Sequence, residues 1–194
     1  MKGKKTAKPL EWKEVRKMLL FLEGVEAYHH LLIIAVGVFT GFRISDMLTL
    51  KYEDFQQDIL NGKRKMTTQK SIPITVELRR VVNLCQLRLK RKDNSHLFVR
   101  SRFRSNKPIS RAAANTRIQE AFEYVGIQGV QLPGHTLRKT FALRYFNLCR
   151  KEKGDYWAIN AVSNLLNHTD TDVTCRYIGL ENPIVYEDVF NDFF

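Results

Sequence analysis

One stretch of the sequence restricts the fold more than any other. Residues 31–39 read Leu-Leu-Ile-Ile-Ala-Val-Gly-Val-Phe, without a single charged side chain. A helix needs about 20 apolar residues to span a bilayer, so this run is too short for a membrane segment. It predicts instead a helix over His30–Phe39 that is covered on all sides by other elements, with Gly41 as its C-terminal cap.

Shorter patterns predict the elements that cover this helix. Apolar residues recur at helical spacing in several segments, which are Leu10–Leu22, Arg43–Leu50, Thr75–Lys92, Ser110–Val125, His135–Arg150 and Tyr156–Leu166. In His135–Arg150 the predicted core stripe is Leu137, Phe141, Tyr145 and Leu148. Phe55–Ile74, with the turn dipeptide Asn61-Gly62, predicts two or three antiparallel strands. The predicted fold class is therefore mainly α with a small antiparallel β-sheet (α+β).

Composition limits the partners and the compartment. The 194 residues include 32 Lys and Arg against 20 Asp and Glu, for a net charge of +12, which is typical of proteins that bind polyanions such as nucleic acid. The length suits one domain with a sizeable core. The basic, polar N-terminal residues lack the apolar region of a signal peptide, so we expect no secretion. The cysteines, Cys85, Cys149 and Cys175, fit neither a disulfide framework nor a zinc site and suggest a reducing cytosol.

Two short motifs pair a cationic side chain with a partner three residues away. Thr40-Gly41-Phe42-Arg43-Ile44-Ser45-Asp46 would place Arg43 and Asp46 on one helix face, where the carboxylate can orient the guanidinium. An exposed ion pair has the same spacing and contributes little. His135-Thr136-Leu137-Arg138 would place two donors where they can hold two oxygens of one phosphate, although polar residues are common at any helix start.

A third motif lies near the end of the chain. His168 stands at a polar break, Thr169–Thr171 predict a turn and a helix start, and Tyr177 follows His168 by nine positions. Val173, Tyr177 and Leu180 are expected on one side of that helix. A tyrosine in such a helix is most often a packing residue, so its functional reading depends on the other groups.

The combined inventory suits attack on a phosphodiester. Guanidinium and imidazole donors can neutralise the non-bridging oxygens, a lysine can protonate the leaving oxygen, and a tyrosine can form a covalent phosphoryl intermediate. The lysines that flank the predicted hairpin are Lys63, Lys65 and Lys70. The sequence pattern alone hardly distinguishes which of them would be the proton donor. No acidic cluster is placed to bind two Mg²⁺ ions, so we expect no metal and no cofactor.

The three motifs, in this order and spacing, resemble the catalytic domain of the tyrosine recombinases, the phage-integrase family. The resemblance covers roughly Pro9 to Leu180 and includes Leu165-Leu166-Asn167-His168 followed by Arg176-Tyr177. It implies a site-specific DNA recombinase of a mobile element that breaks and rejoins strands through a covalent 3′-phosphotyrosyl intermediate, without metal. It also implies double-stranded DNA and a homotetramer on that DNA as partners, and the cytoplasm of a bacterial cell, at the nucleoid, as location.

The resemblance assigns a role to each reacting group. Two arginines clamp the scissile phosphate, two histidines donate hydrogen bonds or transfer protons, a tyrosine is the nucleophile and an aspartate supports the site from behind; these are Arg43 and Arg138, His135 and His168, Tyr177, and Asp46. The family's lysine precedes its Ile-Pro strand by a short hairpin. Counting back from Ile72-Pro73 gives Lys65, with Lys70 as the alternative.

The sequence departs from the family pattern in three places. Asn167 stands where glycine usually precedes the histidine, and Lys139 where a histidine often follows the second arginine. The N-terminal helical domain of most members is missing, so we expect either a fragment or a short member, such as the invertases that switch fimbrial genes. The expected division is a basic arm over 1–8, a catalytic domain over 9–180 and a tail over 181–194.

Other functions share part of this inventory. A type IB topoisomerase uses the same chemistry without a specific site, and a DNA-binding regulator could retain the motifs as relics. The small size favours the recombinase over the first, and the complete catalytic set favours it over the second. An RNA-binding protein would explain the charge but not the ordered motifs.

Two further surfaces are predicted from charge and periodicity. A basic loop leads into a helix whose apolar side faces the core, and we expect this region to contact DNA. The residues concerned are Arg100, Arg102, Arg104, Lys107, Arg111 and Asn115, and Lys70 of the hairpin is added to them. The acidic, apolar tail repeats Val185, Val189 and Phe193 at helical spacing and is expected to dock either on its own domain or on a neighbouring protomer.

Overall fold

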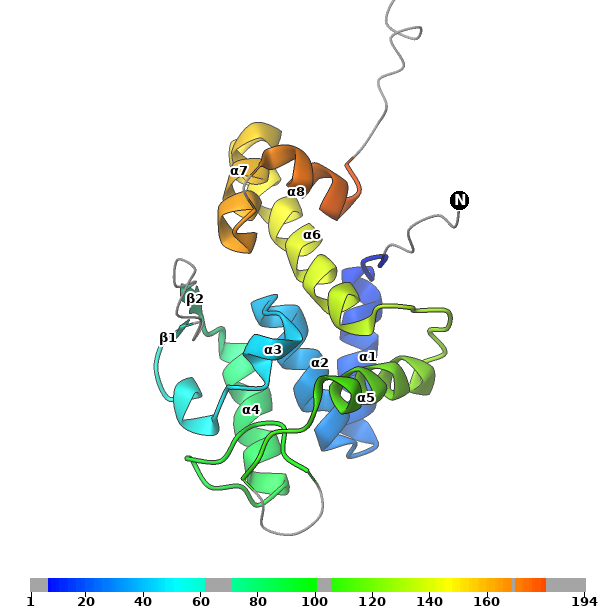
Figure 1. The fold of residues 1–194 in the computed structure, drawn as a ribbon, viewed down its shortest axis with the longest axis vertical. Coiled ribbons are helices and arrows are strands. Elements are labelled where there is room, and N and C mark those ends of the chain that lie inside the picture. Colours follow the sequence, from blue (N-terminus) through cyan, green and yellow to red (C-terminus); the bar gives the residue numbers. More distant parts are fainter. Residues whose placement is uncertain (1–6, 62–70, 101–105, 169, 181–194) are drawn as a thin grey trace, which may run out of the picture.

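The structure is a computed structural model that describes residues 7–61, 71–100, 106–168 and 170–180. It is mainly helical with one small sheet, as predicted (Figure 1). Its elements are α1 (Trp12–Gly24), α2 (Tyr28–Thr40), α3 (Ile44–Met47), the 3₁₀ turn η1 (Tyr52–Phe55), β1 (Ile59–Asn61), β2 (Ser71–Pro73), α4 (Val76–Arg88), α5 (Arg111–Tyr124), α6 (Pro133–Lys153), α7 (Asp155–Leu166) and α8 (Thr171–Ile178).

The central helix predicted from the apolar run is α2. Every residue from Leu31 to Val38 is buried, and α1, α4, α5 and α6 all pack against this helix. Gly37 allows α6 to approach α2 closely, because a Cβ there would overlap the side chain of Leu137 on α6. Gly41 ends α2 in the left-handed conformation with φ +60°, which confirms the predicted cap. The polypeptide can then turn sharply toward α3.

The long helix α6 joins this main core to a second, smaller one. Its first turns pack on α2, and its C-terminal half packs with α7 and α8 at one end of the molecule (Figure 1). The buried side chains of that half are Ala142, Phe146 and Cys149. Of the predicted stripe, Leu137 is buried and Tyr145 packs, partly buried, against this second core. Leu148 is exposed, because α7 and α8 cover a face of α6 that periodicity alone did not distinguish.

Two predicted helices are shorter than their apolar patterns. The segment Arg43–Leu50 contains only the single turn α3, and Arg43 precedes it as an extended N-cap with ψ 150°. The helix predicted over Thr75–Lys92 is capped by Thr75 and ends at Arg88, and Lys90 follows with φ +51°. In both places backbone turns interrupt a pattern that would otherwise continue.

The sheet is a single antiparallel pair. Leu60 lies opposite Ile72, and both side chains are buried against the main core. The predicted turn after Asn61 lies outside the described residues. Across the segments that the structure describes, no helix is both long and apolar enough to pass through a bilayer.

Candidate active site

Arg138 is the most enclosed charged side chain of the site. It lies on the second turn of α6 and is only 5% exposed. Its Nη1 donates to the carbonyl oxygen of Gly41 at 2.6 Å, and its Nη2 donates to that of Leu166 at 2.9 Å. Burial lowers the pKa of Arg138, whereas Tyr177 and Asp46 act in the opposite direction. The two carbonyls fix the guanidinium between the main core and the end of α7.

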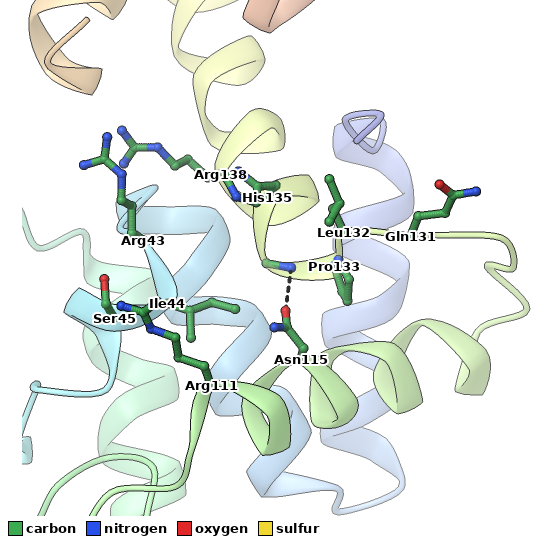
Figure 2. A pocket seen from close by; sticks show the side chains of 11 residues that line it. Arg43, Ile44, Ser45, Arg111, Asn115, Gln131, Leu132, Pro133, His135 and Arg138 are labelled. Atoms are coloured by element: carbon green, nitrogen blue, oxygen red, sulfur yellow. Dashed lines mark hydrogen bonds between the residues drawn. The ribbon is translucent and has the colours of Figure 1, made fainter. Parts of the chain in front are cut away.

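A pocket of about 480 Å³ opens beside this guanidinium. Arg43, His135 and Arg138 line it together with Ser45 and Arg111, and Figure 2 shows the Arg43 and Arg138 side chains extending toward the same side. The two motifs that the sequence singled out separately are therefore adjacent. Such a group of donors suits an anion with several oxygens, such as a phosphodiester.

Asp46 lies close enough to Arg138 for its charge to act there, but the predicted helix face shared by Arg43 and Asp46 is wrong. Arg43 is the non-helical N-cap of α3, so the i, i+3 geometry of a helix does not relate it to Asp46. Asp46 accepts a hydrogen bond from Ser45 Oγ at 3.3 Å, and its charge raises the pKa of Arg138. The carboxylate therefore acts on the second arginine.

The first turn of α6 is fixed by a close contact that the sequence did not predict. The backbone N–H of Gly134 donates to Asn115 Oδ1 at 3.3 Å (Figure 2). A Cβ at Gly134 would overlap the side chain of Ile44, so only glycine permits this approach of α6 to α3. Asn115 therefore holds the first turn of α6 in place, whereas the sequence predicted only that it faces DNA.

His135 lies at the exposed start of α6. Partial burial in the pocket wall lowers its pKa, and the positive charges of Arg138, Arg43 and Lys139 lower it further. At neutral pH the imidazole is consequently uncharged. It can donate one hydrogen bond from one ring nitrogen while accepting a proton at the other.

Tyr177 reaches the same arginines from α8. Burial raises the pKa of its hydroxyl, and Arg138 and Arg43 partly offset that effect. Despite this proximity, the buried hydroxyl makes no hydrogen bond of acceptable geometry with any described residue. The ring packs edge-on against His168 at a centroid distance of 5.2 Å. A protonated phenol is thus held beside Arg138, with Arg43 close enough for its charge to act on the hydroxyl.

Comparison of the sequence with protein-family models identifies the family of this chain. The family model described as "Phage integrase family" matches residues 8–182. The chain belongs to the phage integrase family. This confirms the family predicted from the motifs.

Individual relatives agree with the family assignment. The chain is 29% identical over 145 residues to "Probable integrase/recombinase YoeC" of Bacillus subtilis (strain 168), covering 75% of this chain and 74% of that protein. Its fold is similar to the crystal structure of XerA recombinase, with a TM-score of 0.70, 22% identity, and coverage of 98% of this chain and 66% of that one. The XerH recombinase bound to palindromic difH substrate in a post-cleavage complex gives a TM-score of 0.69 at 19% identity, with coverage of 96% and 54%. The chain thus spans just under two thirds of XerA and about half of XerH.

Asn167 stands where the family usually has glycine, and the backbone there still adopts a conformation that suits glycine. Asn167 caps α7 in the left-handed conformation with φ +54°, which glycine adopts readily and asparagine tolerates better than other residues. The chain then turns so that His168 Nδ1 meets the Thr174 hydroxyl at 2.9 Å. Asp170 caps α8 through a hydrogen bond to the Asp172 N–H, as the polar break predicted.

The buried face of α8 differs from the predicted one. Thr174 and Ile178 are buried, whereas Val173 and Leu180 are each 37% exposed. Thr174 is a site residue that sequence reasoning missed. Its position three residues before Tyr177, on the same helical face, was the available signal.

The structure describes some of the remaining predicted site residues and not others. Arg111 lines the pocket, while Arg100 and Lys107 are exposed on the segments that lead to α5, next to the bridge between Val99 and Pro108. The predicted residues outside the described segments are Lys65, Lys70, Arg102 and Arg104. The general acid therefore stays a prediction.

Proposed function

We propose that this integrase is a site-specific DNA recombinase that breaks and rejoins strands through a covalent 3′-phosphotyrosyl intermediate. The observation that carries the proposal is the buried Tyr177 hydroxyl, held without a hydrogen bond to any described residue beside Arg138 and Arg43. Membership of the phage integrase family supports the same activity. The similar fold of XerH, which is bound to its DNA substrate after cleavage, supports double-stranded DNA as the partner.

The chemistry assigns one step to each group. The Tyr177 oxygen attacks phosphorus and gives up its proton, with His135 or His168 as the acceptor. The bond from phosphorus to the 5′ oxygen breaks, and that oxygen leaves as a 5′-hydroxyl after protonation by Lys65, or by Lys70 in its place. Arg43 and Arg138 balance the charge that develops on the non-bridging oxygens. A 5′-hydroxyl from the partner strand then reverses these steps and releases the tyrosine.

The surface next to the pocket is proposed to hold the DNA backbone. Arg111 lines the pocket wall, so a duplex whose scissile phosphate reaches Arg138 also meets the start of α5. Arg100 and Lys107 extend the positive charge, with Arg102, Arg104 and Lys70 assigned from sequence alone. Asn115 already accepts the Gly134 N–H with its oxygen, so only its amide nitrogen is available to DNA.

The tail over 181–194 is proposed to dock in a neighbouring protomer of a DNA-bound tetramer. Its apolar residues recur at helical spacing, and exposed apolar side chains on the α6–α7 end, Leu148, Tyr156 and Trp157, offer an acceptor. Deletion of 182–194 should leave the domain folded while weakening assembly on DNA, as measured by sedimentation. Unchanged assembly and cleavage by the truncated protein would remove this role.

A selection for covalent complexes tests the activity on many candidate target sites at once. The protein is incubated with a pool of randomised nicked suicide duplexes, and DNA that stays linked to protein through denaturation is sequenced. We expect a defined site, linkage at Tyr177, and full cleavage in EDTA. The variant Tyr177→Phe should bind the same site without linkage.

Each alternative gives a different result in this experiment. Relaxation of supercoiled DNA without a preferred site would indicate a topoisomerase, and binding without any covalent product would indicate a regulator. Cleavage that EDTA stops and Mg²⁺ restores would reject the tyrosine mechanism. We further propose that the protein acts in the cytoplasm of a bacterial cell, at the nucleoid.

A further inference from the structure

Lys139 contacts the tyrosine from a direction that no assigned catalytic group occupies. It follows Arg138 by one position on α6, which turns its side chain about 100° around the helix axis. Its Nζ lies 5.0 Å from the centroid of the Tyr177 ring, over the ring. One turn of α6 therefore directs a guanidinium toward the hydroxyl region of Tyr177 and an ammonium toward its ring.

The ring contacts contribute to the orientation of Tyr177, whose hydroxyl lies beside Arg138 but makes no hydrogen bond of acceptable geometry with a described residue. His168 meets the ring edge-on at 74°, and Lys139 meets it from α6. Lys139 makes no ion pair with any carboxylate that the structure describes, and partial burial lowers its pKa. An ammonium partly removed from water interacts more strongly with an aromatic face than an exposed one does.

We propose that Lys139 is a positioning residue that holds the Tyr177 ring in the orientation required for attack on the scissile phosphate. The inference rests on the proposed function, since it concerns the nucleophile of that reaction. It gives a physical role to a lysine at the position where a histidine often follows the second arginine in this family. Its longer side chain crosses from α6 to α8.

The same helix offers a matched control. Lys153 Nζ lies 4.4 Å from the centroid of the Trp157 ring, so it makes the same type of contact between α6 and α7. Lys153→Met removes a cation–π contact between exposed side chains at the α6–α7 end without changing any contact to Tyr177. A general weakening of this end of the molecule would affect both variants, whereas loss of positioning would affect only Lys139→Met.

The first measurement is the single-turnover rate of covalent adduct formation at saturating protein. We expect Lys139→Met to slow it roughly five- to tenfold, with DNA affinity within about twofold of the parent, and Lys139→Arg to recover most of the rate. Lys153→Met should cleave like the parent. A Lys139→Met rate equal to the parent, or an equal loss in Lys153→Met, would overturn the proposal.

A modified substrate separates positioning from proton donation. A 5′-bridging phosphorothiolate releases a thiolate that needs no proton, so a variant lacking the general acid regains speed on it. We expect Lys139→Met to remain slow on this substrate. Restoration of its rate would show that Lys139 is a proton donor and would reject the positioning role.

A spectroscopic measurement keeps the inference separate from the activity. In protein with ¹³C-labelled tyrosine, the Tyr177 ring signal is identified by its absence in Tyr177→Phe. Without DNA, we expect this signal to shift and broaden in Lys139→Met and to stay unchanged in Lys153→Met. An absence of adduct in the parent protein would refute the proposed function, whereas an unchanged Tyr177 signal in Lys139→Met would refute the role of Lys139.

Discussion

His168 Nδ1 and the Thr174 hydroxyl oxygen lie 2.9 Å apart, across the turn between α7 and α8. The hydroxyl is on a fully buried residue, so its position is fixed by the helix that also carries Tyr177. The hydrogen bond therefore sets the orientation of the imidazole relative to the nucleophile. A buried threonine thus links the orientation of His168 to the helix that carries Tyr177, the proposed nucleophile.

Replacing Thr174 by valine should show this directly. Thr174→Val keeps the side-chain volume and removes the hydroxyl, which leaves His168 Nδ1 without this partner. A lost hydrogen bond of this kind corresponds to about 1 kcal/mol, so we expect single-turnover cleavage to slow roughly fivefold. Thr174→Ser retains the hydroxyl and should restore most of the rate. Equal rates for the valine and serine variants would argue against an orienting role.

The two arginines should differ in their effect on stability. Arg138→Lys loses the planar fork that reaches the carbonyls of Gly41 and Leu166, and we expect the free energy of unfolding to fall by about 2–3 kcal/mol. Arg43 makes no hydrogen bond from its side chain to a described residue, so Arg43→Lys should change stability by less than about 1 kcal/mol. Both should lose cleavage. Urea denaturation and adduct assays measure the two effects separately.

The contact between α3 and α6 predicts a steric effect that a second substitution should relieve. Gly134→Ala would bring a Cβ into the Ile44 side chain and should destabilise the protein by about 1–3 kcal/mol. Adding Ile44→Val to that variant should recover part of the loss, because it removes the overlapping Cδ1 atom. Gly24→Ala is the control, since no atom lies within 4 Å of a Cβ built there. Additive effects of the two substitutions would mean that the residues do not interact.

His29 should make stability depend on pH. Burial, followed by the charges of Arg117, Arg91 and His30, lowers its pKa to about 4, compared with about 6.5 in an unfolded chain. Below pH 6.5 the unfolded state therefore binds a proton that the folded state does not, so stability falls as the pH drops toward 4. The slope is at most about 1.4 kcal/mol per pH unit, and less because the group is partly exposed.

The variant His29→Leu removes this titration. We expect the difference in unfolding free energy between the two proteins to change steadily from pH 6.5 to pH 4 and to be constant above pH 7. Urea unfolding at a series of pH values measures it. A constant difference across the whole range would mean that His29 titrates normally in the folded protein.

The proposed DNA surface should appear in the salt dependence of binding. Each phosphate contact contributes about 0.9 to the slope of log K against log salt concentration, so Arg100→Gln, Lys107→Gln and Arg111→Gln together should reduce the slope by about 2–3. A matched set on the exposed face of α1, Lys13→Gln, Arg16→Gln and Lys17→Gln, should retain it. Equal losses in both sets would show that the charge acts only through the overall field.

The sequence predicted most of the architecture because its strongest signals are local. The apolar run gave α2, and the caps at Ser110, Asp170 and Gly41 lie where polar residues or glycine indicated them. The family motifs also located Arg43, Arg138, His168 and Tyr177 before their proximity was visible. Short-range periodicity and residue chemistry are sufficient for these features.

The errors arose where long-range packing decides the outcome. Periodicity could not show which face of α6 the last two helices cover, so Leu148 was wrongly placed in the core. Nor could it show that Asn115, from α5, accepts a hydrogen bond at the start of α6. The acceptors of Arg138 are backbone carbonyls, which any residue possesses, and no side-chain pattern identifies them in advance.

The two carbonyls that hold Arg138 come from positions far apart in the chain, so its complete hydrogen bonding depends on the C-terminal helices. Gly41 is synthesised early and Leu166 late, so a nascent chain that stops before α7 offers this arginine only one of its two acceptors. Tyr177 emerges from the ribosome later still. A nascent chain that stops before α7 can therefore carry basic surface residues while it lacks both a fully held Arg138 and Tyr177. On the proposed mechanism, a nascent chain that has not yet reached Tyr177 forms no covalent adduct with DNA.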